Sequence, residues 1–132
     1  MKYQFERDTE GGIILVAVEL DNMHTFKMVL DTAASRTTFD TTALQMVGHD
    51  VKSRVSETAV IETANGIVKV GIFGTDSITA FERTVCNMPV QVYDFLAHGI
   101  LSDYDGLLGL DFFENMVLCI DMKNQTIEVK SE

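Results

Sequence analysis

The amino-acid sequence predicts an all-β protein, a closed β-barrel that carries one or two short helices. Segments rich in β-branched and aromatic residues recur along the chain, and most are too short for a helix of ordinary length. Turn-forming residues separate these segments at short intervals. The sequence therefore favours a barrel of short strands over repeated βαβ units.

The N-terminal segment is expected to form three strands. Turn residues at Asp8–Gly12, which include two glycines, and at Asp21-Asn22 separate these strands. The expected strands are Tyr3–Glu6, Ile13–Leu20 and Thr25–Leu30. The third strand runs directly into Asp31.

A short strand and a helix are expected next. The strand is Arg36–Phe39, which is rich in β-prone residues. Asp40 can accept hydrogen bonds from the first turn of a helix over Thr41–Val47. Gly48 would end this helix.

A long hairpin is expected in the middle of the chain. Its two arms are Val55–Glu62 and Ile67–Ile72. The segment Thr63–Gly66 between them contains Asn-Gly, the strongest short-range signal for a β-hairpin.

The C-terminal half continues with short elements. Strands are expected at Ser77–Arg83 and Val85–Tyr93, followed by a less regular stretch. Next come an apolar, glycine-bracketed run at Asp105–Leu110, one helical turn at Asp111–Asn115 and a final hairpin over Met116–Lys130. No linker or repeat interrupts these elements, so one domain is expected over residues 1–132.

The charge balance excludes two classes of partner. Ten Lys and Arg against twenty Asp and Glu give a net charge of −10. Nucleic acids and anionic membranes attract positive surfaces, so neither is an expected partner. The N-terminal residues lack the apolar segment of a signal peptide, and no apolar run approaches the ~18 residues of a membrane span. The expected location is the cytoplasm, unless a leader or anchor has been removed.

The cysteines and histidines do not predict a metal or redox centre. Cys86 and Cys119 are expected to be reduced thiols in the core, with a single disulfide as the alternative. His24, His49 and His98 show no short spacing of the kind found in zinc sites. No cofactor is expected.

Asp31 is the first candidate for chemistry. An apolar strand delivers this carboxylate into the loop Thr32-Ala33-Ala34-Ser35, whose small residues let backbone N–H groups approach it. An aspartate after a strand is more often a turn former or a helix cap, so the motif needs support from elsewhere in the chain.

That support comes from two later motifs. The Asn65-Gly66 hairpin follows, and then Asp105-Gly106-Leu107-Leu108-Gly109 with a short helical turn. Asp-Thr-Ala-Ala-Ser, the hairpin and Gly-Leu-Leu-Gly, in this order, resemble the single-domain, retropepsin-like aspartic proteases of bacterial type. The resemblance spans roughly Ile13 to Val129.

The resemblance implies a role for each residue of the first loop. Asp31 would be the catalytic aspartate, and Thr32 would hydrogen-bond across a dimer axis. Ala33 and Ala34 would keep the loop compact, with backbone N–H groups that steady the carboxylate. Ser35 would face the substrate. The expected activity is the hydrolysis of peptide bonds.

The resemblance also assigns roles to the two later motifs. The hairpin would be a flap that folds over a bound peptide. Its tip residues, together with Ala34 and Ser35, would contact the substrate: Thr63, Ala64, Asn65 and Gly66. Leu107, Leu108 and Gly109 would pack beneath the active-site loop as structural support.

Counting aspartates decides the expected assembly. Hydrolysis by two carboxylates needs a pair of equivalent aspartates at one water molecule. Asp76 follows a glycine in reversed order, and Asp121 leads into Met122-Lys123 instead of a compact loop. Neither matches the Asp31 motif, so a homodimer with the site on its two-fold axis is expected.

One residue departs from the family pattern. The position after Thr32 is usually glycine in the family, and here it is Ala33. Alanine keeps the backbone N–H, but its methyl group would crowd a loop that required glycine angles. A catalytically weak or inactive dimeric module that binds peptides or partners is therefore the alternative function. A barrel scaffold in which Asp31 is only structural is the third reading.

Overall fold

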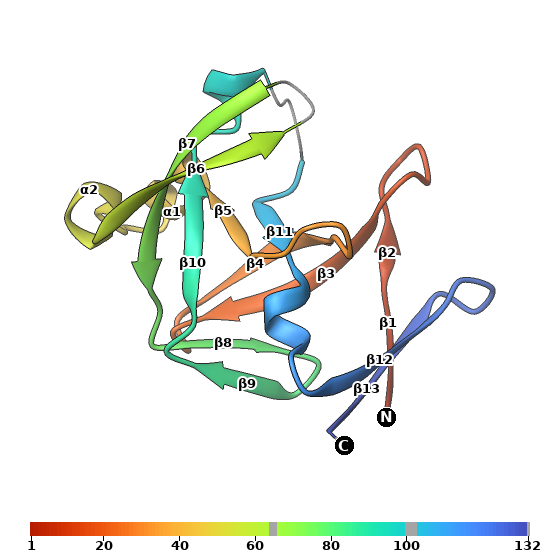
Figure 1. Cartoon of the computed structure of the whole chain (residues 1–132). Helices are drawn as coiled ribbons and strands as arrows, with labels where there is room; N and C mark the ends of the chain where they lie inside the picture. Colours follow the sequence, from red (N-terminus) through yellow and green to blue (C-terminus); the bar gives the residue numbers. More distant parts are fainter. Residues whose placement is uncertain (64–65, 100–102, 132) are drawn as a thin grey trace.

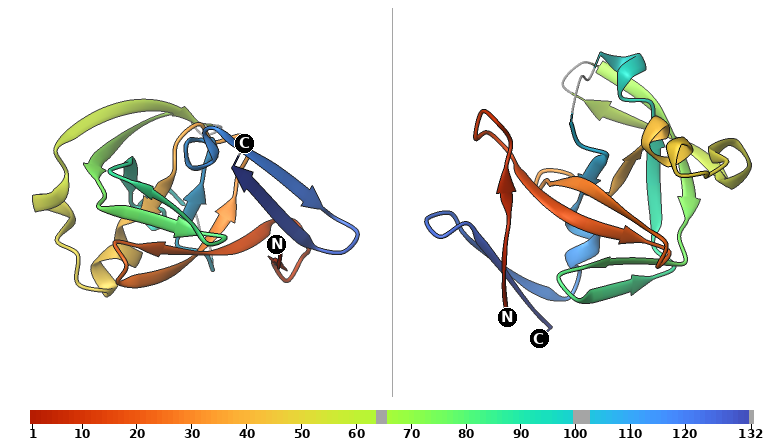
Figure 2. Two further views of the ribbon diagram at one scale, coloured as in Figure 1. Left: turned by 90° about the horizontal axis from the view of Figure 1, so that it is seen from below. Right: turned by 180° about the vertical axis from the view of Figure 1, so that it is seen from behind.

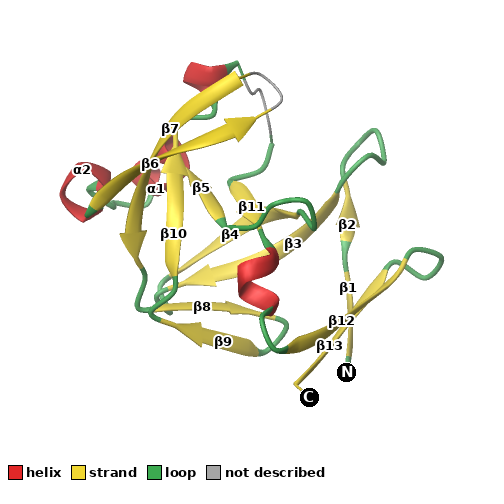
Figure 3. Cartoon of the chain, viewed as in Figure 1, coloured by secondary structure: helices red, strands yellow, loops and turns green. Residues whose placement is uncertain are grey.

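The computed structural model describes residues 1–63, 66–99 and 103–131. Strands dominate this part of the chain and the helices are short, which confirms the mostly-β prediction (Figure 1, Figure 3). The strands are β1 (Lys2–Gln4), β2 (Glu6–Arg7), β3 (Ile14–Leu20), β4 (His24–Leu30), β5 (Thr38–Asp40), β6 (Glu57–Thr63), β7 (Gly66–Gly74), β8 (Ser77–Ala80), β9 (Arg83–Cys86), β10 (Pro89–Tyr93), β11 (Gly106–Leu108), β12 (Met116–Asp121) and β13 (Thr126–Ser131). The helices are α1 (Thr41–Met46), α2 (Val51–Arg54) and the 3₁₀ turns η1 (Leu96–His98) and η2 (Leu110–Phe113).

The strands of the described residues form two sheets. The larger sheet has the order β6-β7-β10-β5-β11-β4-β3-β8-β9, with β2 paired to β3. The smaller sheet, β1-β13-β12, holds both chain ends and projects to one side of the larger one (Figure 2). In the described residues, the strand order of the larger sheet starts at β6 and ends at β9, and these two strands do not pair with each other. Closure of the barrel therefore stays a prediction.

Strands β3 and β4 form the hairpin that leads to Asp31. Asp21 and Asn22 turn the chain with φ of 54° and 56°, which Asn and Asp tolerate better than most residues. Alternate residues of both strands point into the hydrophobic core. These core residues are Val16, Val18, Leu20, Phe26, Met28 and Leu30.

Strand β11 lies between β4 and β5, parallel to the first and antiparallel to the second. The approach to β5 is so close that a Cβ on Gly106 would lie 2.2 Å from the carbonyl oxygen of Thr38. Glycine is therefore required at this position. Leu108 pairs with Leu30, so the end of β11 lies beside the residue that precedes Asp31.

The first helix agrees with its sequence signals and the second was not expected. Asp40 caps α1 through a 3.3 Å hydrogen bond from the amide of Ala43, and Gly48 follows the helix with φ of 96°. Asp50 caps α2 in the same way, accepting from the amide of Ser53 at 3.4 Å. Asp50 and Ser53 give the sequence an N-cap pattern, Asp-x-x-Ser. The helix that follows is only one turn long, so no longer helical pattern marked it.

The β6–β7 hairpin projects from the larger sheet (Figure 1). Its strands pair from Glu57 with Ile72 to Thr63 with Gly66. β7 pairs with β10 only over Gly71–Gly74, so the outer half of the hairpin extends past that strand.

Two expected strands are wrong because the chain turns inside them. Phe81 and Glu82 adopt φ of 54° and 58°, and this turn separates β8 from β9. Left-handed φ is uncommon for such residues, so no turn signal marked the position. Asn87, with φ of 58°, likewise divides the expected strand Val85–Tyr93. The first strand is interrupted at Phe5, which is buried between β1 and β2.

The expected core location of the two cysteines is wrong. Cys86 and Cys119 are free thiols, but both are exposed and neither lies in the core. Cys86 belongs to β9 and Cys119 to β12, and both side chains are open to solvent. In the described part of the chain, no helix is long and apolar enough to cross a bilayer.

Candidate active site

Asp31 lies at the point where β4 leaves the sheet. Its amide donates a 3.0 Å hydrogen bond to the carbonyl of Leu108, which continues the parallel pairing of β4 and β11 by one residue. The end of the strand that leads to it is apolar and buried, whereas Asp31 itself is half-buried. The carboxylate is therefore held on a rigid element with one side open.

Backbone hydrogen bonds shape the loop after Asp31. The amide of Ala33 donates to Oδ1 of Asp31 at 2.9 Å, and the amide of Ala34 donates to its carbonyl at 3.1 Å. Thr32, Ala33 and Ser35 are exposed, and Ala34 is half-buried. The loop thus presents three small side chains outward, while the amide of Ala33 holds the carboxylate and the amide of Ala34 closes the turn on the main chain.

Alanine fits this loop without backbone strain. Ala33 is not among the residues that adopt left-handed φ in the described part of the chain. Its methyl group is exposed, so it does not crowd the loop of its own chain. The hydrogen bond expected from its backbone N–H is present.

Gly109 brings the end of β11 against the same loop. A Cβ at this position would lie 2.7 Å from the carbonyl carbon of Arg36 and 2.8 Å from the carbonyl oxygen of Ala34. The next amide, of Leu110, donates to that oxygen of Ala34 at 2.8 Å. Close backbone packing of this kind holds the loop after Asp31 on β11.

A buried polar bridge lies under the loop, and the sequence reasoning missed it. The hydroxyl of Thr37, which is 0% exposed, donates to Oδ1 of Asp111 at 2.7 Å and accepts from the amide of Gly109 at 3.1 Å. The amide of Thr37 donates to Oδ2 of Asp111 at 2.9 Å. The partners are 74 residues apart, so no local pattern marked them.

The role of Leu107, Leu108 and Gly109 as structural support stays a prediction. Leu108 is fully buried in the core, Leu107 is half-buried, and Gly109 contacts the loop directly. Thr63 and Gly66 pair at the outer end of the β6–β7 hairpin. The two remaining substrate-contact predictions, Ala64 and Asn65, lie outside the described residues.

Tyr104 is a second residue that sequence reasoning did not place at the site. Burial raises the pKa of its phenol, and the negative charge of Asp31 raises that pKa further. Its ring packs against Phe95 with the centroids 6.1 Å apart, and Phe95 packs against Tyr93 at 5.0 Å. An aromatic cluster therefore lies within electrostatic reach of Asp31.

The acidic residues beside Tyr104 have different surroundings. Asp105 accepts a 2.9 Å hydrogen bond from the amide of Lys27, so its carboxylate fastens β11 to β4. Asp103 is exposed and lines a pocket of about 370 Å³ between Tyr104 and the β2–β3 turn. The same pocket contains Glu6, Arg7, Asp8, Glu10 and Lys27, so its lining is mixed in charge.

The histidines come closer together than their sequence spacing indicated. The rings of His24 and His49 lie 5.8 Å apart, edge to face. Among the described residues, no group of three or more His, Cys, Asp or Glu side chains is arranged to hold a metal ion.

Comparison with known proteins identifies a family and a fold for this chain. A family model described as aspartyl protease matches residues 16–112. The crystal structure of a retropepsin-like aspartic protease from Rickettsia conorii superimposes with a TM-score of 0.69 at 20% sequence identity, covering 98% of this chain and 91% of that chain. No curated protein matches the sequence. The structural match identifies a retropepsin-like fold, as the sequence motifs implied.

Proposed function

Because the chain belongs to the aspartyl protease family, we propose that it is an endopeptidase whose catalytic dyad is Asp31 from each of two protomers. The observation that carries this proposal is the half-buried carboxylate of Asp31, held by the amide of Ala33 beside a loop of exposed small residues. In this proposal the chain acts as one domain over residues 1–132.

The chemistry requires two carboxyl groups in different protonation states. Two carboxylates that share a site cannot both ionise easily, so the pair retains one proton. The ionised carboxylate removes a proton from a water molecule, and that water attacks the scissile carbonyl carbon. The protonated carboxyl group hydrogen-bonds the carbonyl oxygen and stabilises the charge that develops there.

The homodimer follows from the one suitable aspartate that each chain supplies. Thr32, Ala33 and Ser35 are exposed in the described chain, which leaves their side chains available to a second copy. In the dimer, Thr32 would hydrogen-bond across the two-fold axis and bring the two loops together. An isologous interface of this type places both Asp31 residues on the axis.

The substrate would bind as an extended peptide between the two Asp31 residues and the β6–β7 hairpins. Backbone groups of the hairpin can add the substrate as a further strand, which gives affinity without strong sequence selectivity. Its outer half exposes Val60 and Ile67, which are 66% and 76% accessible. Thr63, Ala64, Asn65 and Gly66 at the tip, with Ala34 and Ser35 below, are the proposed contacts.

The cytoplasm is the proposed location. Cys86 and Cys119 are both free and exposed, and exposed thiols persist in reducing compartments. Peptides or proteins are the proposed substrates, and a second copy of the chain is the proposed partner.

An unbiased peptide library incubated with wild type and with Asp31→Asn tests the proposal across acid and neutral pH. We expect cleavage by wild type and none by Asp31→Asn. Asp121→Asn is the matched control, because Asp121 also ends an apolar strand but should leave the cleavage pattern unchanged. Identical cleavage by wild type and Asp31→Asn would refute the proposal. Light scattering on the same sample should give the mass of a dimer.

The alternative is a dimeric module that binds peptides without cleaving them. Ala33 at the family's glycine position is the observation that favours it. In that case, wild type and Asp31→Asn would bind library peptides equally well and neither would release products.

A further inference from the structure

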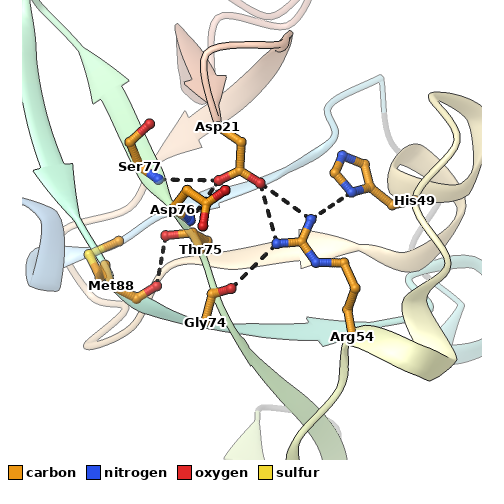
Figure 4. A network of polar contacts seen from close by, with 8 residues as sticks. All are labelled: Asp21, His49, Arg54, Gly74, Thr75, Asp76, Ser77 and Met88. Atoms are coloured by element: carbon orange, nitrogen blue, oxygen red, sulfur yellow. Dashed lines mark hydrogen bonds and ion pairs between the residues drawn. The ribbon is translucent and has the colours of Figure 1, made fainter.

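At the base of the β6–β7 hairpin, the guanidinium of Arg54 connects the segment before β6 with the end of β7 (Figure 4). Arg54 ends α2, shortly before β6 begins, and its Nη2 donates a 3.4 Å hydrogen bond to the carbonyl of Gly74, where β7 ends. The guanidinium also stacks on Phe73 of β7, 4.6 Å from the ring centroid. One side chain therefore holds both the entry and the exit of the hairpin.

The same guanidinium is tied to the body of the protein through Asp21. Nη1 and Nη2 of Arg54 each lie 3.3 Å from Oδ2 of Asp21, in the β3–β4 turn. The other oxygen, Oδ1, accepts from the amides of Asp76 at 2.8 Å and Ser77 at 3.2 Å. The side chain of Asp21 is only 7% exposed and that of Arg54 is 28% exposed, so the carboxylate of this ion pair is shielded from water and the guanidinium is partly so.

The base of the hairpin decides where its outer end lies. β7 pairs with β10 only over Gly71–Gly74, and among the described residues β6 pairs with β7 alone. The part of β7 from Gly71 to Gly66 thus extends about 16 Å beyond its pairing with β10, at about 3.3 Å per residue. A rotation at the base therefore moves the outer end of the hairpin, where Thr63 pairs with Gly66, more than it moves the base.

His49 completes the network in one protonation state. Its Nδ1 lies 2.8 Å from Nη1 of Arg54. Arginine stays protonated and can only donate, so Nδ1 accepts and the ring is neutral with its proton on Nε2, a buried atom without a hydrogen-bond partner among the described residues. Arg54 faces the ring from α2, Asp21 from the β3–β4 turn and His24 from β4.

We propose that Arg54 is a positioning residue that orients the β6–β7 hairpin for substrate binding, and that protonation of His49 releases this anchor. The inference rests on the proposed function for the hairpin's role above the substrate. With a proton on Nδ1, the N–H of His49 would face the N–H of Arg54 at 2.8 Å between the nitrogens, so two donors would oppose each other. Both side chains would also carry a positive charge. The guanidinium would then leave that position, and its contacts with Gly74 and Phe73 would loosen.

The direction of the pH effect follows from the surroundings of His49. Burial and the charge of Arg54 lower the pKa of His49 from its ordinary value of 6.5, against a smaller opposing effect of Asp21. The neutral ring is therefore favoured in the folded protein, and its contribution is fully present above pH 6.5. It is lost as the pH falls below that value toward the lowered pKa.

Hydrogen exchange tests the anchor without any need for activity. Arg54→Lys keeps a positive charge opposite Asp21 but loses the planar fork. We expect amides of β6 and of residues 66–70 to exchange several-fold faster, and amides of β3 and β4 to exchange as in wild type. Lys52→Gln, on the exposed side of the same helix, is the control and should change neither group. Equal protection of the hairpin in wild type and Arg54→Lys would overturn the inference.

The pH response tests the role of His49. Asn places an amide oxygen close to the position of Nδ1 and cannot be protonated near neutral pH, so His49→Asn keeps the acceptor and removes the titration. After correction for intrinsic exchange, hairpin protection should fall between pH 7 and pH 5 in wild type but stay constant in His49→Asn. The same fall in both proteins would contradict the proposal.

Kinetics separate this inference from the proposed function. For a peptide that wild type cleaves, Arg54→Lys should lower kcat/KM about fivefold to tenfold, mainly through KM. A general loss of folded protein would lower the apparent kcat instead. If wild type cleaves no peptide while hydrogen exchange shows the anchor, the proposed function fails and the anchor stands. If wild type cleaves but KM is unchanged in Arg54→Lys, the positioning role fails and the protease stands.

Discussion

The amide of Ala33 donates a 2.9 Å hydrogen bond to Oδ1 of Asp31, although the family usually has glycine at this position. The bond uses the backbone, which alanine and glycine share. Because Ala33 does not adopt a left-handed φ, the methyl group imposes no backbone strain here. The orientation of the carboxylate is therefore compatible with alanine.

Ala33→Gly should accordingly leave activity nearly unchanged. We expect kcat/KM within about threefold of wild type, because the hydrogen bond to Asp31 is preserved. Stability should fall by about 0.4–1 kcal/mol, since glycine gains freedom in the unfolded chain. Steady-state kinetics and urea unfolding measure both. A gain in activity of more than about tenfold would show instead that alanine impairs the dyad.

The Thr37–Asp111 bridge should be important for stability. Thr37→Val keeps the side-chain shape but leaves the buried amide of Gly109 and the carboxylate of Asp111 without that partner. We expect a loss of about 1–3 kcal/mol in the free energy of unfolding, measured by urea denaturation. Thr42→Val on the exposed surface of α1 is the control. Equal losses in the two variants would argue against the bridge.

Gly109→Ala should be among the most damaging single substitutions. The added methyl would lie within 2.8 Å of three backbone atoms, which cannot move aside as a flexible side chain can. We expect a loss of about 3 kcal/mol or more. Gly74→Ala is the matched control, because no atom lies within 4 Å of the position that its methyl group would take and its φ is not left-handed. Thermal unfolding of both variants compares them, and a stable Gly109→Ala protein would contradict the close packing.

The proximity of Tyr104 to Asp31 predicts a shift in a tyrosine titration. The charge of Asp31 raises the pKa of Tyr104, so Asp31→Asn should lower that pKa toward the ordinary value of 10.0. Phenolate absorbance reports Tyr104 alone in a Tyr3→Phe, Tyr93→Phe background, because the chain has three tyrosines. Asp103→Asn, which changes a neighbouring acid, should leave the titration in place. Coincident titration curves with and without the Asp31→Asn substitution would place the two groups apart.

Local sequence signals predicted much of the fold. The Asn65-Gly66 pair marked the hairpin, and Asp40 marked the start of α1, because turn chemistry and capping depend on neighbouring residues. The same reasoning missed the turn at Phe81 and Glu82, because neither residue type favours a left-handed φ. There the pairing of β8 with β9 decides the conformation.

The candidate site was predictable only in part. Asp31 and its compact loop stand together in the sequence, so their pattern was visible. Thr37 and Asp111 meet across 74 residues. Tyr104 comes within electrostatic reach of Asp31, and the chain after Tyr104 runs into β11, which pairs with β4 and β5. Arg54 and Asp21 also interact across a long separation, 33 residues in the chain. Such pairs depend on topology, and no local spacing encodes them.

Subunit mixing distinguishes a dyad shared between two protomers from chains that act alone. Wild-type and Asp31→Asn chains are mixed in varied ratios, allowed to exchange and assayed on a peptide that wild type cleaves. If one dyad needs Asp31 from both protomers, activity follows the square of the wild-type fraction, so an equal mixture retains about a quarter of the activity. Activity that follows the wild-type fraction linearly, with about half remaining, would show that each chain acts alone and would contradict the shared dyad.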